Sequence, residues 1–145
     1  MYVSRIDGDV ITYDIRMKKP NGGDYLANGA MHTFEHLFAT YSRNSEYKDS
    51  VIYVGPMGCR TGFYLLMRGN IADNEKNLSA LKSALKDIIA HEGQMPGAHR
   101  RECGNYRCLS VTAAKREAEK YLAVLEEKGK NISFSYNGDT MDGGI

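Results

Sequence analysis

The sequence predicts an α+β fold. Two kinds of segment predict it: short stretches in which apolar and polar residues alternate, as in half-buried strands, and longer stretches with apolar residues at helical spacing. These segments do not alternate strictly along the chain, which disfavours a parallel α/β fold. The 145 residues show no composition break, so we expect a single domain, 1–145.

The first two strands are predicted to form a hairpin. Residues 10–17 place Ile11 and Ile15 on one face and polar side chains on the other, which is typical of a half-buried strand. The preceding "DGD" turn joins this segment to a strand at 2–6. Residues 18–29 are rich in Gly, Asn and Pro and are predicted to form a loop.

Helices and further strands follow this loop. A helix is predicted from about Asn28 to Tyr41, with Asn28 as its candidate N-cap. Strands are predicted at 50–54 and 63–69, around a glycine-rich turn. The remaining predicted elements are a helix at 73–93 capped by Asp73 or Asn74 and ended by Gly93, a helix at 111–129, an edge strand at 132–136 and a loose tail over about 130–145.

The composition disfavours several classes of protein. Lys and Arg number 19 against 18 Asp and Glu, so no basic field favours nucleic acid. No apolar run is long enough for a signal peptide or a membrane helix, and we expect no membrane partner. Three cysteines are an odd number, which argues against a disulfide framework and favours a reducing cytoplasm.

The segment "HTFEH" carries the strongest chemical signal. His32 and His36 are four residues apart, so on a helix they project about 40° apart and can reach one metal ion. Glu35 projects about 60° to the other side of His32 and can move protons near such an ion. The order His-x-x-Glu-His is the inverted zincin pattern. The alternative is two surface histidines on an ordinary helix.

A catalytic zinc site usually has three protein ligands, so a third is needed. His91, near a helix end, suits the helix dipole, and His99, beside two arginines, is expected to be solvated. Cys108 is expected to be a small core or surface thiol. The residue pattern leaves Cys59 and Cys103 open as third ligands.

Cys59 lies in the segment "PMGCRTGFY". The flanking glycines let the backbone bend and bring a substrate close. Arg60 adjoins the thiol, and its charge together with a nearby metal ion would favour the thiolate. The alternative is an inert buried loop cysteine.

Four segments of the sequence resemble one family, the S-ribosylhomocysteine lyases (LuxS enzymes). They are "ITYDIRMKKPN", "HTFEHLFATYSRN", "GPMGCRTGFYL" and "ECGNYRCLSVTAAK", in family order from residue 10 to about 125. The resemblance implies an antiparallel sheet with helices packed on one face, assembled as a homodimer with its sites at the interface. It also implies one divalent metal ion per chain, ferrous iron in the native state, with zinc or cobalt as replacements. By position it assigns metal binding to His32, His36 and Cys103, catalysis to Cys59 and Glu35, and substrate binding to Arg16.

The implied reaction cleaves S-ribosylhomocysteine to homocysteine and dihydroxypentanedione, the autoinducer-2 precursor of quorum sensing. Two carbonyl migrations along the ribose put a ketone beside the carbon that must lose a proton. β-Elimination then expels the homocysteine thiolate. Each migration needs a Lewis acid at the oxygen and a base that returns the proton to the neighbouring carbon.

Departures from the family pattern keep two other hypotheses open. A family segment of the form "SFxLDHT" has no counterpart here, and Tyr53, Gly55 and Cys108 replace residues common at those positions. We therefore expect an open cleft edge and slow turnover, and a weakened paralogue that keeps the fold and metal is the second hypothesis. The third, an inverzincin-like metallopeptidase, needs a third His or Glu ligand.

Overall fold

The computed structural model describes residues 1–128 and 134–135. Its four strands form one sheet in the order β1-β2-β4-β3, with every neighbouring pair antiparallel. This arrangement confirms the predicted α+β class and the antiparallel sheet. The strands are β1 (Tyr2–Asp7), β2 (Val10–Arg16), β3 (Val51–Pro56) and β4 (Gly62–Arg68). The helices are α1 (Asn28–Arg43), α2 (Asn74–Ala90) and α3 (Val111–Lys128), with short 3₁₀ turns η1 (Ile71–Asp73) and η2 (Tyr106–Cys108).

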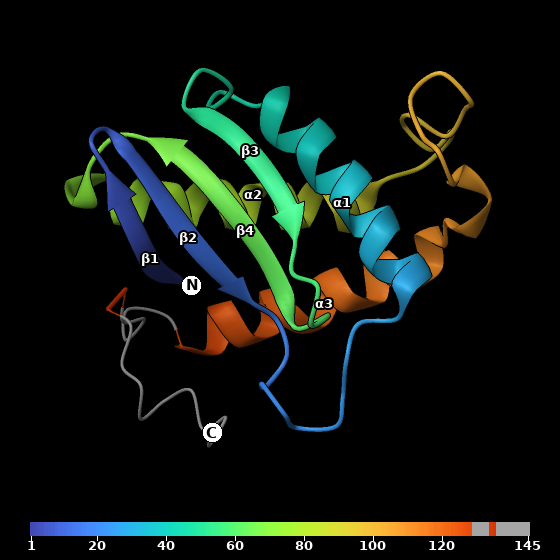
Figure 1. Cartoon of the computed structure of the whole chain (residues 1–145), viewed down its shortest axis with the longest axis horizontal. Helices are drawn as coiled ribbons and strands as arrows, with labels where there is room; N and C mark the ends of the chain where they lie inside the picture. The colour runs from blue at the N-terminus through green and yellow to red at the C-terminus, as the bar shows by residue number, and fades with distance from the viewer. Residues whose placement is uncertain (129–133, 136–145) are drawn as a thin grey trace.

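The core lies between the sheet and the helices. In Figure 1, α2 runs behind the sheet, α3 crosses near the lower ends of β2 and β4, and α1 lies beside β3. Opposite residues of an antiparallel pair point to the same face, and the pairs of β2 with β4 on the inner face are almost fully buried. These pairs are Ile11 with Met67, Tyr13 with Leu65, and Ile15 with Phe63. On the outer face, Tyr53 and Tyr64 are 50% and 39% exposed. The described helices therefore cover one face of the sheet, as expected.

Three predicted helix signals differ from the structure. Asn28 is the first residue of α1, and Ala27 holds the N-cap position without a side-chain hydrogen bond. Asp73 stands at the N-cap of α2, but its carboxylate accepts from the backbone N–H of Asn70, so it closes η1 and does not cap the helix. The α2 helix ends at Ala90, before Gly93. At Asp73 the reason is a contact outside the helix, because the backbone N–H of Asn70 takes the carboxylate that the local pattern assigned to the cap.

The predicted edge strand at 132–136 is described only at two residues. The carbonyl of Phe134 accepts a hydrogen bond from the backbone N–H of Val3 at 2.8 Å, and Ser135 forms a parallel bridge with the same residue. The rest of the predicted loose tail lies outside the described residues. None of the helices in the described part of the chain is long and apolar enough to span a membrane.

Gly62 permits the close pairing of β2 and β4 at the end of the sheet that carries Arg16. A Cβ atom at Gly62 would lie 2.0 Å from the carbonyl oxygen of Ile15, a contact that only movement of the backbone relieves. The turn before β4 therefore depends on a residue without a side chain at this position.

We expect Gly62→Ala to lower the free energy of unfolding by about 1–3 kcal/mol, because the added methyl group forces the two strands apart. The matched control is Gly58→Ala in the same turn, where a Cβ meets nothing within 4 Å. Thermal or denaturant unfolding of both variants tests this. Equal free energies of unfolding for the two variants would show that β2 and β4 accommodate the methyl group without loss of stability.

Candidate active site

The helix α1 has a buried face and a half-buried face. Phe34 and Phe38 are 1% exposed, and the ring of Phe34 lies 4.7 Å from that of Phe63 on the sheet. The pattern of residues three and four apart then places His32 and His36 together on the other side, where both are half-buried. The apolar side of the helix thus determines where the two imidazoles point.

Three side chains converge outside this face of α1. The Nε2 atoms of His32 and His36 are 3.1 Å apart, and the Cys103 sulfur lies 3.3 Å from Nε2 of His32. All three ligand atoms lie within 4.8 Å of one another. Two nitrogens bound about 2 Å from a tetrahedral zinc would be roughly 3.3 Å apart, so the donors are spaced for one ion. Of the candidate third ligands, Cys103 is the one that joins the histidines among the described residues.

The outer nitrogen of each histidine also has a partner. Nδ1 of His36 donates to the carbonyl of Pro96 at 2.9 Å, which leaves its Nε2 unprotonated for a metal ion. Nδ1 of His32 lies 3.0 Å from the Cys108 sulfur, whose own S–H donates to the carbonyl of Asn105. The sulfur can therefore accept a hydrogen bond from the Nδ1–H group of His32. This bond holds His32, like His36, in the tautomer whose Nε2 carries no proton.

Sequence reasoning missed this contact of Cys108. The thiol is exposed, as expected of a surface thiol, but it is also the outer partner of a candidate ligand. Cys108 and His32 are 76 residues apart, and no local periodicity relates residues at that distance. Its position five residues after Cys103 and its departure from the family pattern were the two signals that pointed to it.

Thr33 links α1 to the loop that carries both cysteines. Its hydroxyl donates to the carbonyl of Gly29 at 2.7 Å and accepts from the backbone N–H of Ser110 at 2.6 Å. Thr33 is completely buried, so both bonds are shielded from water. A Cβ atom on Gly29 would lie 2.6 Å from the carbonyl oxygen of Cys108, which shows how closely the loop approaches the helix.

The remaining histidines lie outside the cluster. His91 is buried at the C-cap of α2, where its Nδ1 is 2.7 Å from the hydroxyl of Tyr41. His99 is largely exposed, as predicted, and pairs with Glu102 at 3.2 Å.

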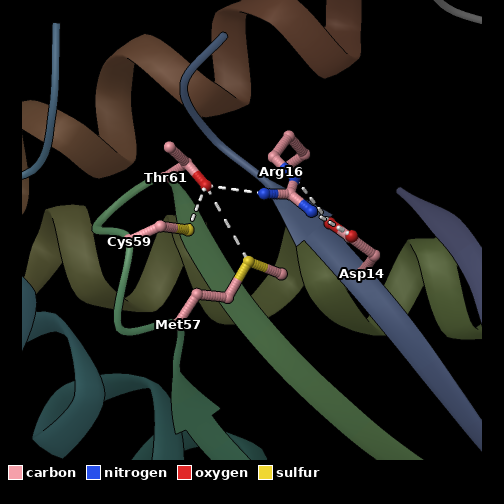
Figure 2. A network of polar contacts seen from close by, with 5 residues as sticks. All are labelled: Asp14, Arg16, Met57, Cys59 and Thr61. Atoms are coloured by element: carbon pink, nitrogen blue, oxygen red, sulfur yellow. Dashed lines mark hydrogen bonds and ion pairs between the residues drawn. The ribbon is translucent and has the colours of Figure 1, made fainter. Parts of the chain in front are cut away.

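Cys59 lies in a second polar cluster, at the end of the sheet (Figure 2). Its sulfur is 3.0 Å from the Thr61 hydroxyl, which accepts a hydrogen bond from Nη1 of Arg16 at 2.6 Å. Asp14 binds the Nε and Nη2 atoms of Arg16, so the guanidinium is held from two sides. The sulfur is exposed, so the alternative of a buried loop cysteine is wrong.

This environment favours the charged forms of Cys59 and Arg16. Partial burial of the thiol raises its pKa, but the hydrogen bonds from Thr61 and the charge of Arg16 outweigh burial and leave the pKa of Cys59 below its ordinary value. Burial likewise lowers the pKa of Arg16, but Asp14 outweighs this effect and leaves the pKa raised. An exposed thiol of lowered pKa is suited to accept and return protons.

Arg60 does not act as the sequence predicted. It has a positive φ of 61°, and its guanidinium lies 5.7 Å from the centre of the Tyr25 ring and 3.5 Å from the carbonyl of Leu26. The cation that lowers the pKa of Cys59 is Arg16, which lies 43 positions earlier in the chain and which no local pattern connects with Cys59. Glu35 is half-buried on α1, and its carboxylate makes no hydrogen bond or ion pair within residues 1–128 and 134–135.

The chain is similar to proteins of one family along most of its length. The family model described as S-Ribosylhomocysteinase (LuxS) matches residues 2–132. A protein of Thermus thermophilus named S-ribosylhomocysteine lyase is 51% identical over 115 residues, which cover 79% of this chain and 72% of the relative. Proteins of the same name from Porphyromonas gingivalis and Clostridium acetobutylicum are 47% and 42% identical over 141 and 131 residues. They cover 94% and 87% of this chain, and 88% and 82% of the relatives.

We expect Thr33→Val to lower the free energy of unfolding by about 1–3 kcal/mol, because the N–H of Ser110 loses its partner. Thr40→Val is the matched control, since its hydroxyl also bonds a carbonyl one turn earlier, that of His36, but receives no bond from the loop. Its effect should stay within about 0.5 kcal/mol. Denaturant unfolding measures both, and equal losses would remove the special role of Thr33.

We expect Cys108→Ala to weaken zinc binding by about tenfold or more, because His32 loses the partner of its outer nitrogen. Cys108→Asp supplies another acceptor at this position and should bind more tightly than the alanine variant. Competition with a chromogenic chelator gives the three dissociation constants. If the Cys108→Ala variant binds zinc as tightly as the natural protein, the contact between Cys108 and His32 does not support the site.

Proposed function

The chain belongs to the S-ribosylhomocysteinase (LuxS) family, and on that premise we propose that it is an S-ribosylhomocysteine lyase. It cleaves the carbon–sulfur bond of S-ribosylhomocysteine and releases homocysteine and dihydroxypentanedione. The observation that carries the proposal is the presence in one fold of a His-His-Cys donor cluster and a separate thiol of lowered pKa. Carbonyl migration followed by β-elimination needs both kinds of group.

His32, His36 and Cys103 hold one divalent metal ion, which is ferrous iron in the native enzyme and replaceable by zinc or cobalt. Imidazole and thiolate together suit iron and zinc. When bound, the ion supplies the Lewis acidity that polarises an oxygen of the sugar. The contacts at Pro96 and Cys108 keep the Nε2 atoms of both histidines free of protons.

Cys59 acts as the base at carbon. Its thiolate takes a proton from the sugar carbon beside the carbonyl and returns it to the neighbouring carbon, so that the carbonyl moves along the chain. Glu35 holds and moves the protons of the sugar oxygens, a role that suits a carboxylate with no hydrogen-bond partner among the described residues. In the last step the Cys59 thiolate accepts a proton from the carbon beside the ketone, and the electrons of that C–H bond form the double bond that expels homocysteine as a thiolate. Arg16, held by Asp14, binds the substrate near Cys59.

The enzyme is proposed to work as a homodimer in the cytoplasm. The outer face of the sheet carries exposed Tyr53 and Tyr64, which offer apolar surface for a second copy of the chain. The three cysteines of the chain are free thiols. The site requires at least Cys59 and Cys103 in reduced form, and a reducing compartment keeps them so.

Two other functions are less well supported. A metallopeptidase of the inverzincin kind would use a third His or Glu ligand, whereas the third donor here is the sulfur of Cys103. A weakened paralogue would bind metal and release no thiol from the substrate. The appearance of free thiol from S-ribosylhomocysteine with metal-replete protein tests the proposed function directly, and its absence would favour the paralogue.

The ligand assignment predicts about one divalent ion per chain. We expect His36→Ala and Cys103→Ala each to lose it, because two remaining ligands hold an ion poorly. Elemental analysis of the purified proteins, with His99→Ala as a histidine control outside the cluster, gives the ratio. Full retention of metal in both ligand variants would overturn the assignment.

Cys59→Ser and Glu35→Gln should keep the metal and lose activity. We expect turnover to fall by about 10²–10⁴, the usual range for one acid or base, because serine ionises poorly at neutral pH and glutamine does not ionise. Glu119→Gln, at an exposed position of α3, serves as the control. Metal loss in Cys59→Ser would make Cys59 a ligand, and normal turnover in Glu35→Gln would refute its role.

A further inference from the structure

We infer that Thr61 is a positioning residue whose hydroxyl transmits the positive charge of Arg16 to the Cys59 sulfur and so favours the thiolate form. The inference rests on the proposed role of Cys59 as the base. It assigns a task to a side chain that has no acid–base chemistry of its own in the reaction. Figure 2 shows Thr61 between the other two side chains, with one dashed line from its hydroxyl to Arg16 and another to the Cys59 sulfur.

The direction of the two hydrogen bonds follows from their chemistry. A guanidinium only donates, so Nη1 of Arg16 donates to the Thr61 oxygen across 2.6 Å. The hydroxyl has one proton of its own, and the Cys59 sulfur lies 3.0 Å away. The competing acceptor is the thioether sulfur of Met57, which is 3.9 Å away and accepts weakly. A Cys59 thiolate has no proton to donate, so the hydroxyl proton then points at that sulfur in a charge-assisted bond.

Asp14 makes the intermediate hydroxyl necessary. It occupies the Nε and Nη2 atoms of Arg16 and partly neutralises the guanidinium. Only Nη1 is left to face the turn that carries Cys59, and it donates a hydrogen bond to Thr61. The stabilisation of the thiolate by a direct donor therefore comes from the threonine, and Arg16 strengthens that donor by polarising it.

The position of Thr61 is determined before any substrate binds. Its side chain is almost fully buried, and its backbone carbonyl accepts hydrogen bonds from the N–H groups of Met17 and Lys18, each at 2.9 Å. The N–H of Arg60 bonds the carbonyl of Met57 at 3.0 Å and closes the turn. A donor held in this way costs little to reorganise when charge develops on the sulfur.

Few charged groups of the described chain face Cys59. On β2 they are Arg16 and its partner Asp14, and on β4 the Tyr64 hydroxyl interacts with Arg16. Arg60 is the neighbouring cation, but its guanidinium lies against Tyr25 and the carbonyl of Leu26. A change at Thr61 therefore alters one hydrogen bond to the sulfur while these charges stay in place.

The test is the pH dependence of Cys59 alkylation in metal-replete protein. Iodoacetamide reacts with the thiolate, and mass spectrometry of the Cys59 peptide separates it from Cys103 and Cys108. We expect the midpoint for Thr61→Val to rise, so that the alkylation rate near neutral pH falls about tenfold, the effect of one hydrogen bond to a charged group. Thr61→Ser keeps the hydroxyl and should keep the midpoint.

An unchanged midpoint in folded Thr61→Val would overturn the inference, and so would an equal rise in Thr61→Ser, which would indicate lost packing and not a lost donor. If the valine variant does not fold, Thr61→Ala compared with Thr61→Ser makes the same distinction. Alkylation needs no substrate. If the natural protein releases no thiol from S-ribosylhomocysteine, the proposed function is refuted, but the alkylation midpoints still test the role of Thr61.

Discussion

The rotation of α1 about its own axis is the constraint on which the candidate site depends. Phe34 and Phe38 are buried against the sheet, and burying one such side chain contributes about 1.5–3 kcal/mol. A turn of the helix that moved His32 and His36 away from their partners would expose both rings to water. Apolar packing thus determines the direction of the two imidazoles, although neither phenylalanine has a part in the chemistry.

The loop before α3 supplies the remaining groups of the candidate metal site. It supplies the Cys103 sulfur on the inner side of the histidines, and Pro96 and Cys108 as acceptors on their outer side. Each bond alone contributes little, but together they hold both rings with their Nε2 atoms facing the same point. The buried hydroxyl of Thr33 ties the same loop to the helix, so the donors are arranged before an ion arrives.

The second cluster shows how a sheet can hold a reactive thiol. The pairing of β2 with β4 sets Arg16 opposite Gly62, and the turn before Gly62 carries Cys59 and Thr61. The exposed sulfur is open to a substrate, whereas the groups that lower its pKa are buried or half-buried behind it. The rigid strands fix the charges and the turn presents the thiol, which is the division of labour expected of a catalytic site on a stable scaffold.

Local periodicity in the sequence was enough to identify the strands, the three helices and the pair of histidines, because each of these depends on backbone geometry within one element. The caps of the helices differ from the local pattern: Asn28 lies one residue inside α1, and Asp73 holds the N-cap position of α2 but bonds Asn70 instead of the helix. The residue pattern left Cys59 and Cys103 open as ligands, and the family resemblance named Cys103. Its sulfur lies beside His32 across 71 positions, a proximity that arises only when α1 and the loop pack together. The Cys108 contact and the link from Arg16 through Thr61 to Cys59 were likewise decided by tertiary structure, since they join side chains from different elements.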